Sequence, residues 1–222
     1  METMDLITRI VVLATDLGLH IADSSKSFRN SVCKTYNLSW LKNKRLRHVL
    51  DTEFFIWTWT MATYYGAVHC LSQGMSKEAS LYQSIFEDYF SVVLKDRDTF
   101  EIFHFWKKYI DDVANISEED YQGRYGYSER ILEKLTDMLS LKTLRYIHEE
   151  IVELDIDALN ETWGEHIIAV QQDLEFVVYR IVDVINQYFT EIDESSVEVA
   201  FEAIRNKEPV KSLIAQWQAS EV

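Results

Sequence analysis

The chain has 222 residues, which suits one large domain or two small ones, and its 47% hydrophobic and 13% aromatic residues can fill a sizeable core and exclude extended disorder. Gly occurs 6 times and Pro once, too few for the many corners of a strand-rich fold. The formal net charge of −15 argues against a general nucleic-acid binder, because contacts with phosphates require a cationic surface. We therefore expect an all-α protein, a single-domain bundle of about 7–9 helices over residues 1–222 around a buried, aromatic-rich central helix.

The first helix is predicted over residues 4–22, where apolar residues recur at intervals of three and four. Residues 23–25, Asp-Ser-Ser, favour turns and are expected to end this helix. A second, polar helix is predicted over residues 27–36.

The central helix is predicted over residues 52–71, with Gly74 as its stop signal. From Phe54 to Met75 the sequence contains no Asp, Glu, Lys or Arg. Several threonines dilute this stretch, and Trp57 and Trp59 lie deep inside it rather than at a membrane interface. The pattern therefore favours the buried centre of a bundle over a membrane span.

The helix after Gly74 is expected to begin at Ser76, to end before the charged residues 95–98 and to bury Leu81, Ile85, Tyr89, Val92 and Val93. Further helices are predicted over residues 99–113, 128–154 and 157–189, and the last of these has the clearest apolar spacing in the chain. Residues 193–222 are expected to form a C-terminal pair of short amphipathic helices that serves as a docking element.

The two cysteines, Cys33 and Cys70, are too few for a disulfide framework or a cysteine-rich metal site, which favours a reducing compartment. Cys70 belongs to the apolar central helix and is predicted to be a buried small hydrophobe. The first residues lack the basic and small-residue pattern of a signal peptide, so we expect a cytoplasmic protein.

Charge is distributed unevenly along the chain. Residues 24–50, the basic segment, contain no acid and seven basic residues: Lys26, Arg29, Lys34, Lys42, Lys44, Arg45 and Arg47. The other 15 basic residues stand against all 37 acidic ones, which leaves −22 outside the basic segment.

The basic segment predicts a surface for an anionic ligand or nucleic acid, with Lys42, Lys44, Arg45 and Arg47 as its candidate contacts. The alternatives are pairing with the chain's own acids at residues 118–120 or 149–153, or a merely solvated face. The acidic remainder of the chain would suit a cationic partner.

Two acidic clusters suggest metal chemistry, but each is incomplete. Glu101 and His104 have the Glu-x-x-His spacing of helical di-metal sites, yet no second such pair occurs. Conceivable further ligands from other helices are Glu53, Glu165 and His166. The glutamates of residues 149–153 resemble a Mg²⁺-binding cluster, but the corresponding second helix lacks its acidic pair. Surface pairs and a solvated helix face are the alternatives.

Two further features suit recognition of a partner. The loop over residues 121–127 supplies the candidate contacts Tyr121, Arg124, Tyr125 and Tyr127, because tyrosine gives a large contact area with few torsions. Trp217 suits docking in a partner's groove or in a second copy of the chain. The alternative for both is packing against the protein's own core.

We expect a non-enzymatic regulatory module that binds another protein or a second copy of itself, with no cofactor and no membrane partner, because no complete catalytic set is present. The first alternative is a helical-bundle enzyme that depends on a divalent metal at Glu101 and His104 or at residues 149–153. The second is a binder of anionic ligands or nucleic acid through the basic segment.

Overall fold

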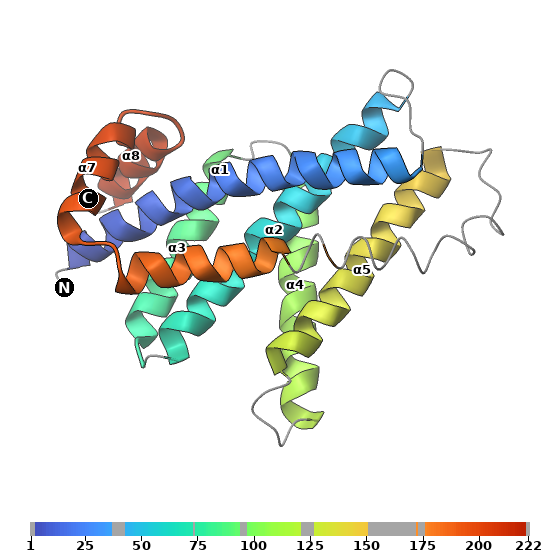
Figure 1. Cartoon of the computed structure of the whole chain (residues 1–222). Helices are drawn as coiled ribbons and strands as arrows, with labels where there is room; N and C mark the ends of the chain where they lie inside the picture. The colour runs from blue at the N-terminus through green and yellow to red at the C-terminus, as the bar shows by residue number, and fades with distance from the viewer. Residues whose placement is uncertain are drawn as a thin grey trace. The chain divides into compact units, whose positions relative to one another are not determined.

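A computed structural model describes residues 3–36, 43–72, 74–93, 97–120, 127–150, 172 and 176–220, and this part of the chain is helical without strands (Figure 1). The helices are α1 (Thr3–Thr35), α2 (Lys44–Ser72), α3 (Ser76–Val93), α4 (Arg97–Asp120), α5 (Tyr127–Glu150), a helix over residues 176–190, α7 (Glu194–Ile204) and α8 (Val210–Ser220). The all-α prediction is confirmed, and the 8 helices of the described residues fall within the predicted range.

Backbone contacts group the chain into two compact units. Unit 1 comprises Met1–Ile21, Trp59–Phe100 and Val178–Val222, and unit 2 comprises Ala22–Thr58 and Glu101–Val177. Each of α1 and α2 therefore contributes residues to both units. The expectation of one domain over residues 1–222 stays a prediction.

α1 is one continuous helix, so the predicted end at residues 23–25 is wrong. Its buried stripe continues through this segment at intervals of three and four, with Ile21, Ser25, Phe28 and Val32. Asp23 lies on the exposed side, where its Oδ1 is 3.1 Å from Lys26 Nζ. Burial of the stripe outweighs the weak helix propensity of Asp and Ser, because tertiary packing supplies most of a helix's stability.

α2 is the predicted buried, aromatic-rich helix, but it begins at Lys44 rather than at residue 52. Its first turns bury Leu46 and Leu50, which explains the longer helix. Trp57 and Trp59 are 0% and 1% exposed. Across the described residues, no helix combines the length and the apolar character that crossing a membrane requires.

The predicted end of α2 at Gly74 is confirmed, and the backbone geometry of Gly74 explains why the helix ends there. Gly74 adopts a φ of 75°, where its N–H donates to the Leu71 carbonyl at 3.0 Å and the Met75 N–H donates to the Cys70 carbonyl at 2.9 Å. These bonds satisfy the last carbonyls of α2, and only glycine adopts this backbone shape without strain. Cys70 is buried as predicted, and burial and the nearby Glu78 raise the pKa of its thiol to about 11.

α3 packs on the part of α2 that belongs to unit 1. The buried residues of α3 are Ala79, Tyr82, Ile85, Phe86, Tyr89 and Phe90. Trp59 Nε1 donates to the Phe86 carbonyl at 3.2 Å, and Tyr82 Oη donates to the Ala62 carbonyl at 3.0 Å. Val93, predicted to be buried, is 41% exposed although it shares the helix face of Phe86, because it is the last residue of α3.

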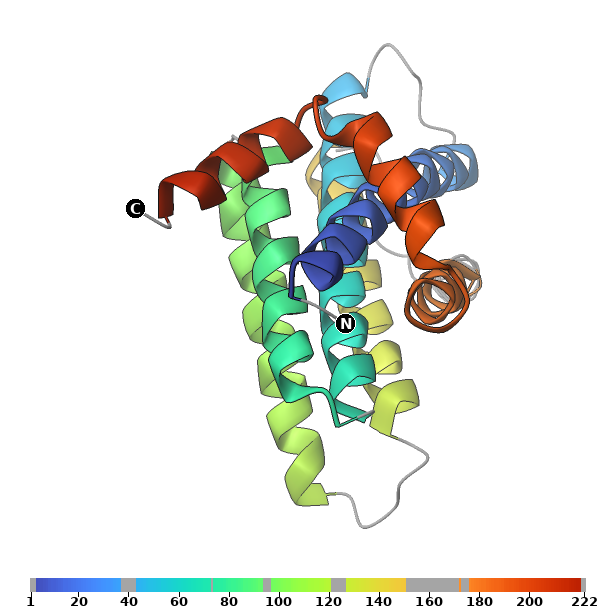
Figure 2. The same cartoon turned by 90° about the vertical axis from the view of Figure 1, so that its left-hand side faces the viewer.

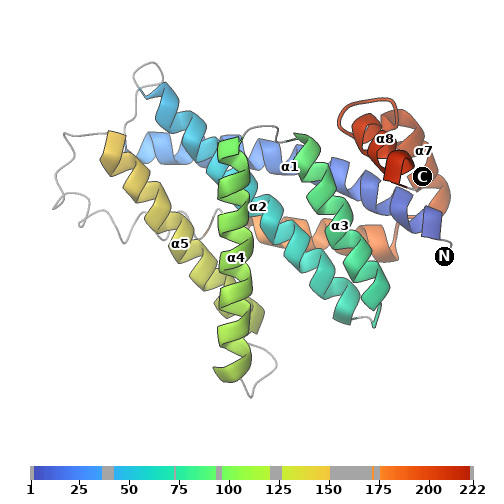
Figure 3. The same ribbon diagram turned by 180° about the vertical axis from the view of Figure 1, so that it is seen from behind.

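Figure 3 shows α4 and α5 from behind. α4 continues to Asp120 rather than ending at residue 113, whereas α5 begins at Tyr127, one residue before its predicted start, and residues 151–154 of its predicted range lie outside the described residues. Of the helix predicted over residues 157–189, residues 172 and 176–189 are helical and the rest lie outside the described residues. The C-terminal helix pair is confirmed as α7 and α8, and α8 packs against α3 (Figure 2).

We predict that Gly66→Ala destabilises the protein, whereas Gly18→Ala does not. A Cβ on Gly66 would lie 2.0 Å from Cζ of the buried Tyr82 ring, but one on Gly18 would lie 3.4 Å from Cζ3 of Trp59. Overpacking costs about 1–3 kcal/mol, whereas alanine at a helical position where its Cβ makes only ordinary van der Waals contact gains about 1 kcal/mol over glycine. Thermal unfolding of the two variants checks this, and equal melting temperatures would contradict the close approach of α2 and α3.

Candidate functional site

Residues of α7 and of the first turns of α1 line a pocket of about 340 Å³ in unit 1. Figures 1 and 2 show α7 next to the start of α1. Its lining residues, which define the α7 pocket, are Thr8, Arg9, Glu194, Val197, Glu198, Phe201 and Glu202. Ligand pockets span roughly 300–1,000 Å³, so this one suits a small molecule or one or two side chains of a partner. The pocket involves residues 193–222, the segment expected to be a docking element.

Arg9 is the central charged group of the pocket, and it is only 8% exposed. Its Nη1 donates to the carbonyls of Tyr188 at 2.6 Å and Ile192 at 2.7 Å. Tyr188 belongs to the last turn of the helix over residues 176–190, where carbonyls lack helical partners and carry partial negative charge, and Ile192 follows just after that helix. The guanidinium therefore joins α1 to the segment from which α7 starts.

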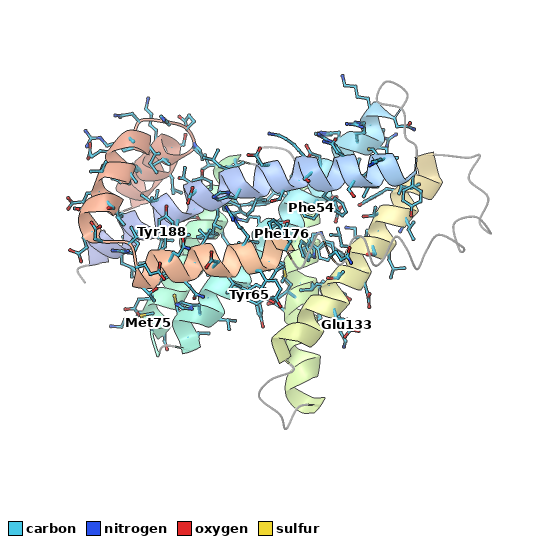
Figure 4. All side chains as sticks on the ribbon, in the orientation of Figure 1. Phe54, Tyr65, Met75, Glu133, Phe176 and Tyr188 are labelled. Atoms are coloured by element: carbon cyan, nitrogen blue, oxygen red, sulfur yellow. The ribbon has the colours of Figure 1, made fainter. Side chains whose placement is uncertain are left out.

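A second bond supports the same junction. Tyr188 Oη donates to Asp16 Oδ2 at 3.3 Å, so this tyrosine also links the helix over residues 176–190 to α1 (Figure 4). Burial, and then the nearby Asp16 carboxylate, raise the pKa of Tyr188 to about 12. The phenol therefore stays protonated and remains a donor at neutral pH.

Asp193 sets the start of α7. Its Oδ1 accepts from Ser195 Oγ at 2.6 Å and from the Ser196 N–H at 2.9 Å, and its Oδ2 accepts from Ser196 Oγ at 2.9 Å. An N-cap aspartate of this kind satisfies a backbone donor that has no helical partner. Val197 is 4% exposed, so its side chain packs the first turn of α7 into unit 1.

Three glutamates follow one face of α7. Glu194, Glu198 and Glu202 recur every fourth residue, which places them above one another along the helix. Glu202 pairs with Arg205 at 2.9 Å, whereas Glu194 and Glu198 form no ion pair or hydrogen bond within the described residues. With Glu202 neutralised, the α7 pocket retains two carboxylates against one guanidinium.

Unit 2 contains a second cluster of polar groups, the Glu53 cluster, formed by Glu53, Trp106, Lys142 and Tyr146. Glu53 is 1% exposed. Its Oε1 is 2.6 Å from Trp106 Nε1 and 2.5 Å from Lys142 Nζ, and its Oε2 accepts from Tyr146 Oη at 2.8 Å. The Lys142 ammonium also lies 4.1 Å from the centre of the Phe105 ring.

The Glu53 cluster ties α2, α4 and α5 together. Both oxygens of the Glu53 carboxylate accept from side chains of other helices, and the ammonium on one of them balances its charge. A buried carboxylate is tolerated only with such partners, because its loss of hydration must be offset. We interpret the cluster as a structural one, since both oxygens of its carboxylate already have partners within the protein.

The predicted metal pair does not gain Glu53 as a further ligand. Glu101 and His104 are both exposed on α4, and Glu53 instead belongs to its own cluster in unit 2. Among the side chains that the structure describes, no group of three His, Cys, Asp or Glu could hold a metal ion. The metal site at Glu101 and His104 stays a prediction.

The basic segment is partly neutralised by acids that flank it. Arg29 Nη1 lies 3.3 Å from Asp51 Oδ2, and Lys26 pairs with Asp23. The acids involved therefore differ from those expected at residues 118–120 and 149–153, whose side chains lie outside the described ones. Arg47 Nη2 donates to Asn30 Oδ1 at 3.2 Å.

Of the other predicted contacts, Lys44 and Arg45 are exposed at the start of α2. Residues outside the described backbone are Lys42, Tyr121, Arg124 and Tyr125. Tyr127 begins α5 and Trp217 belongs to α8, but their side chains lie outside the described ones. The predictions made for these residues remain predictions.

The sequence analysis missed Arg9, Lys142 and the glutamates of α7. A usable signal was present for Arg9, which interrupts the apolar stripe of α1 next to the buried Ile10. Glu53 similarly precedes the buried Phe54. A single charge within an apolar stripe indicates a buried group with a specific partner, but not which residue that partner is.

Comparison with protein-family models, with curated proteins and with solved structures gave no match to this chain.

We expect Glu53→Gln to lower the free energy of unfolding by about 3–5 kcal/mol, because it leaves the Lys142 ammonium without a counter-charge. Urea unfolding measures this loss. The matched control is Glu133→Gln on α5, an exposed residue that should change stability little (Figure 4). The double variant Glu53→Leu with Lys142→Met should recover only part of the loss, because it removes both charges but leaves Trp106 Nε1 without its acceptor. A Glu53→Gln variant as stable as the control would refute the role of the cluster.

The stability of unit 1 should depend on the protonation of Asp193. Bonds from Ser195 and Ser196 lower the pKa of Asp193 from its ordinary 3.8 to about 2, so its ionised form stabilises the folded state above about pH 4, and this contribution disappears as the pH falls to about 2. Asp193→Asn keeps a capping oxygen but does not titrate. Melting temperatures measured between these pH values should therefore fall less steeply for the variant, and parallel curves would count against the cap.

Proposed function

We propose that this protein is a non-enzymatic module that binds a basic segment of a partner protein through the α7 pocket. The observation that carries the proposal is a pocket of about 340 Å³ in which Glu194 and Glu198 hold no partner within the described residues. Carboxylates without an ion-pair partner attract cationic groups, and the formal charge of −15 steers a basic partner toward the protein.

The shape of the pocket supports a side chain as its occupant. Val197 and Phe201 line it between the glutamates and offer an apolar wall. Lysine and arginine combine a methylene stem with a cationic head, so the stem would pack on this wall while the head meets a carboxylate. An inorganic cation would bind the carboxylates but would make no apolar contact with Val197 and Phe201.

The two alternatives receive less support from the described residues. A metal-dependent enzyme needs a ligand cluster, and no such group of side chains occurs in the described ranges. A binder of anionic ligands needs unpaired cations, but Arg29 and Lys26 of the basic segment pair with neighbouring acids. The paired acids reduce the net positive charge of that surface.

The test uses a labelled peptide rich in lysine and arginine, with binding followed by fluorescence anisotropy. Glu198→Gln should weaken binding roughly two- to fivefold, because one exposed ion pair contributes about 0.2–1 kcal/mol. Glu191→Gln is the matched control, since it removes the same charge from an exposed position outside the pocket.

A general attraction to the acidic surface predicts equal losses for Glu198→Gln and Glu191→Gln, whereas binding in the pocket predicts a loss only for Glu198→Gln. Equal losses, or no measurable binding at low ionic strength, would refute the proposed function. Binding should also weaken as salt increases, because the carboxylates are exposed to solvent.

A further inference from the structure

Arg9 holds more hydrogen-bonding capacity than its structural bonds use. A guanidinium carries five N–H donors, and within the described residues both bonds of Arg9 come from Nη1. Nε and Nη2 hold no partner there, although the side chain is 92% buried and lines the α7 pocket. The planar pair of N–H groups that remains matches the geometry of a carboxylate, which it can bind through two parallel bonds.

Opposite charges line the same pocket without pairing with each other. No ion pair joins Arg9 to Glu194, Glu198 or Glu202 within the described residues. A simple anion would bind Arg9 but face the carboxylates of α7, and a simple cation would bind the carboxylates but face Arg9. A ligand that carries both a carboxylate and a cation satisfies both sets of groups.

We infer that the α7 pocket recognises the carboxyl-terminal residue of a partner protein when that residue is lysine or arginine. The terminal carboxylate binds the free donors of Arg9, the methylene stem packs on Val197 and Phe201, and the cationic head lies between Glu194 and Glu198. This inference rests on the proposed function and specifies which part of the basic segment enters the pocket.

The net charge of the site agrees with this occupant. Glu194, Glu198 and Arg9 together carry −1, because Glu202 pairs with Arg205. A carboxyl-terminal lysine or arginine carries −1 on its carboxylate and +1 on its side chain, so a further basic residue upstream supplies the attraction to the acidic surface. We therefore use a peptide with one internal lysine and a terminal arginine as the probe.

The experiment compares this peptide as a free acid with the same peptide amidated at its carboxyl terminus. Amidation removes the carboxylate without altering the protein, which matters because Arg9→Gln would also remove the bonds to Tyr188 and Ile192. The free acid should bind at least tenfold more tightly than the amide, since a hydrogen bond to a charged group contributes more than the roughly 1.4 kcal/mol that corresponds to tenfold. Isothermal calorimetry with the full chain measures both affinities.

Three further measurements separate the outcomes. Glu198→Gln should weaken binding of the free acid, whereas Glu191→Gln should not. Equal affinity of free acid and amide, with both weakened by Glu198→Gln, would overturn the inference and leave the proposed function standing. Absence of binding by either peptide would overturn both. Free arginine that binds as tightly as the peptide would show that the occupant is the amino acid rather than a protein terminus.

Discussion

The bonds from the Arg9 guanidinium to the carbonyls of Tyr188 and Ile192 determine the position of the α7 pocket. The end of any helix leaves carbonyls without partners in that helix, and donors from elsewhere in the fold can satisfy them. α1 supplies one such donor group, and the chain then continues directly into the Asp193 cap and α7. One cation thus closes a helix and faces the pocket at the same time.

Unit 2 also contains a buried charged side chain, but its charge is negative. Glu53 is buried on α2, and its partners come from α4 and α5, so the three helices can pack in this way only when the carboxylate meets all its donors. Such a cluster contributes specificity of packing more than net stability, because desolvation offsets much of the attraction. Apolar contacts alone, such as the stacking of Phe28 on Phe54 at 4.3 Å, tolerate more than one arrangement.

Apolar spacing predicted the helical class, the buried α2 and the C-terminal pair of helices, because burial of one face dominates helix stability. It failed at residues 23–25, where local propensity favoured a turn but the buried Ser25 keeps the stripe of α1 intact. The end of α2 at Gly74 was predictable because the positive φ required there depends on the residue type and not on tertiary packing. The pocket could not be predicted, since Arg9 and Glu198 are far apart in sequence and only tertiary packing brings them to one cavity.

The interleaving of the two units has a consequence for the order in which the protein acquires its structure during synthesis. Every residue of unit 2 precedes Val178, whereas unit 1 needs Val178–Val222 as well as Met1–Ile21 and Trp59–Phe100. A chain emerging from the ribosome therefore contains all of unit 2 before unit 1 is complete. Until Tyr188 and Ile192 have been translated, the first helix carries an arginine whose acceptors do not yet exist.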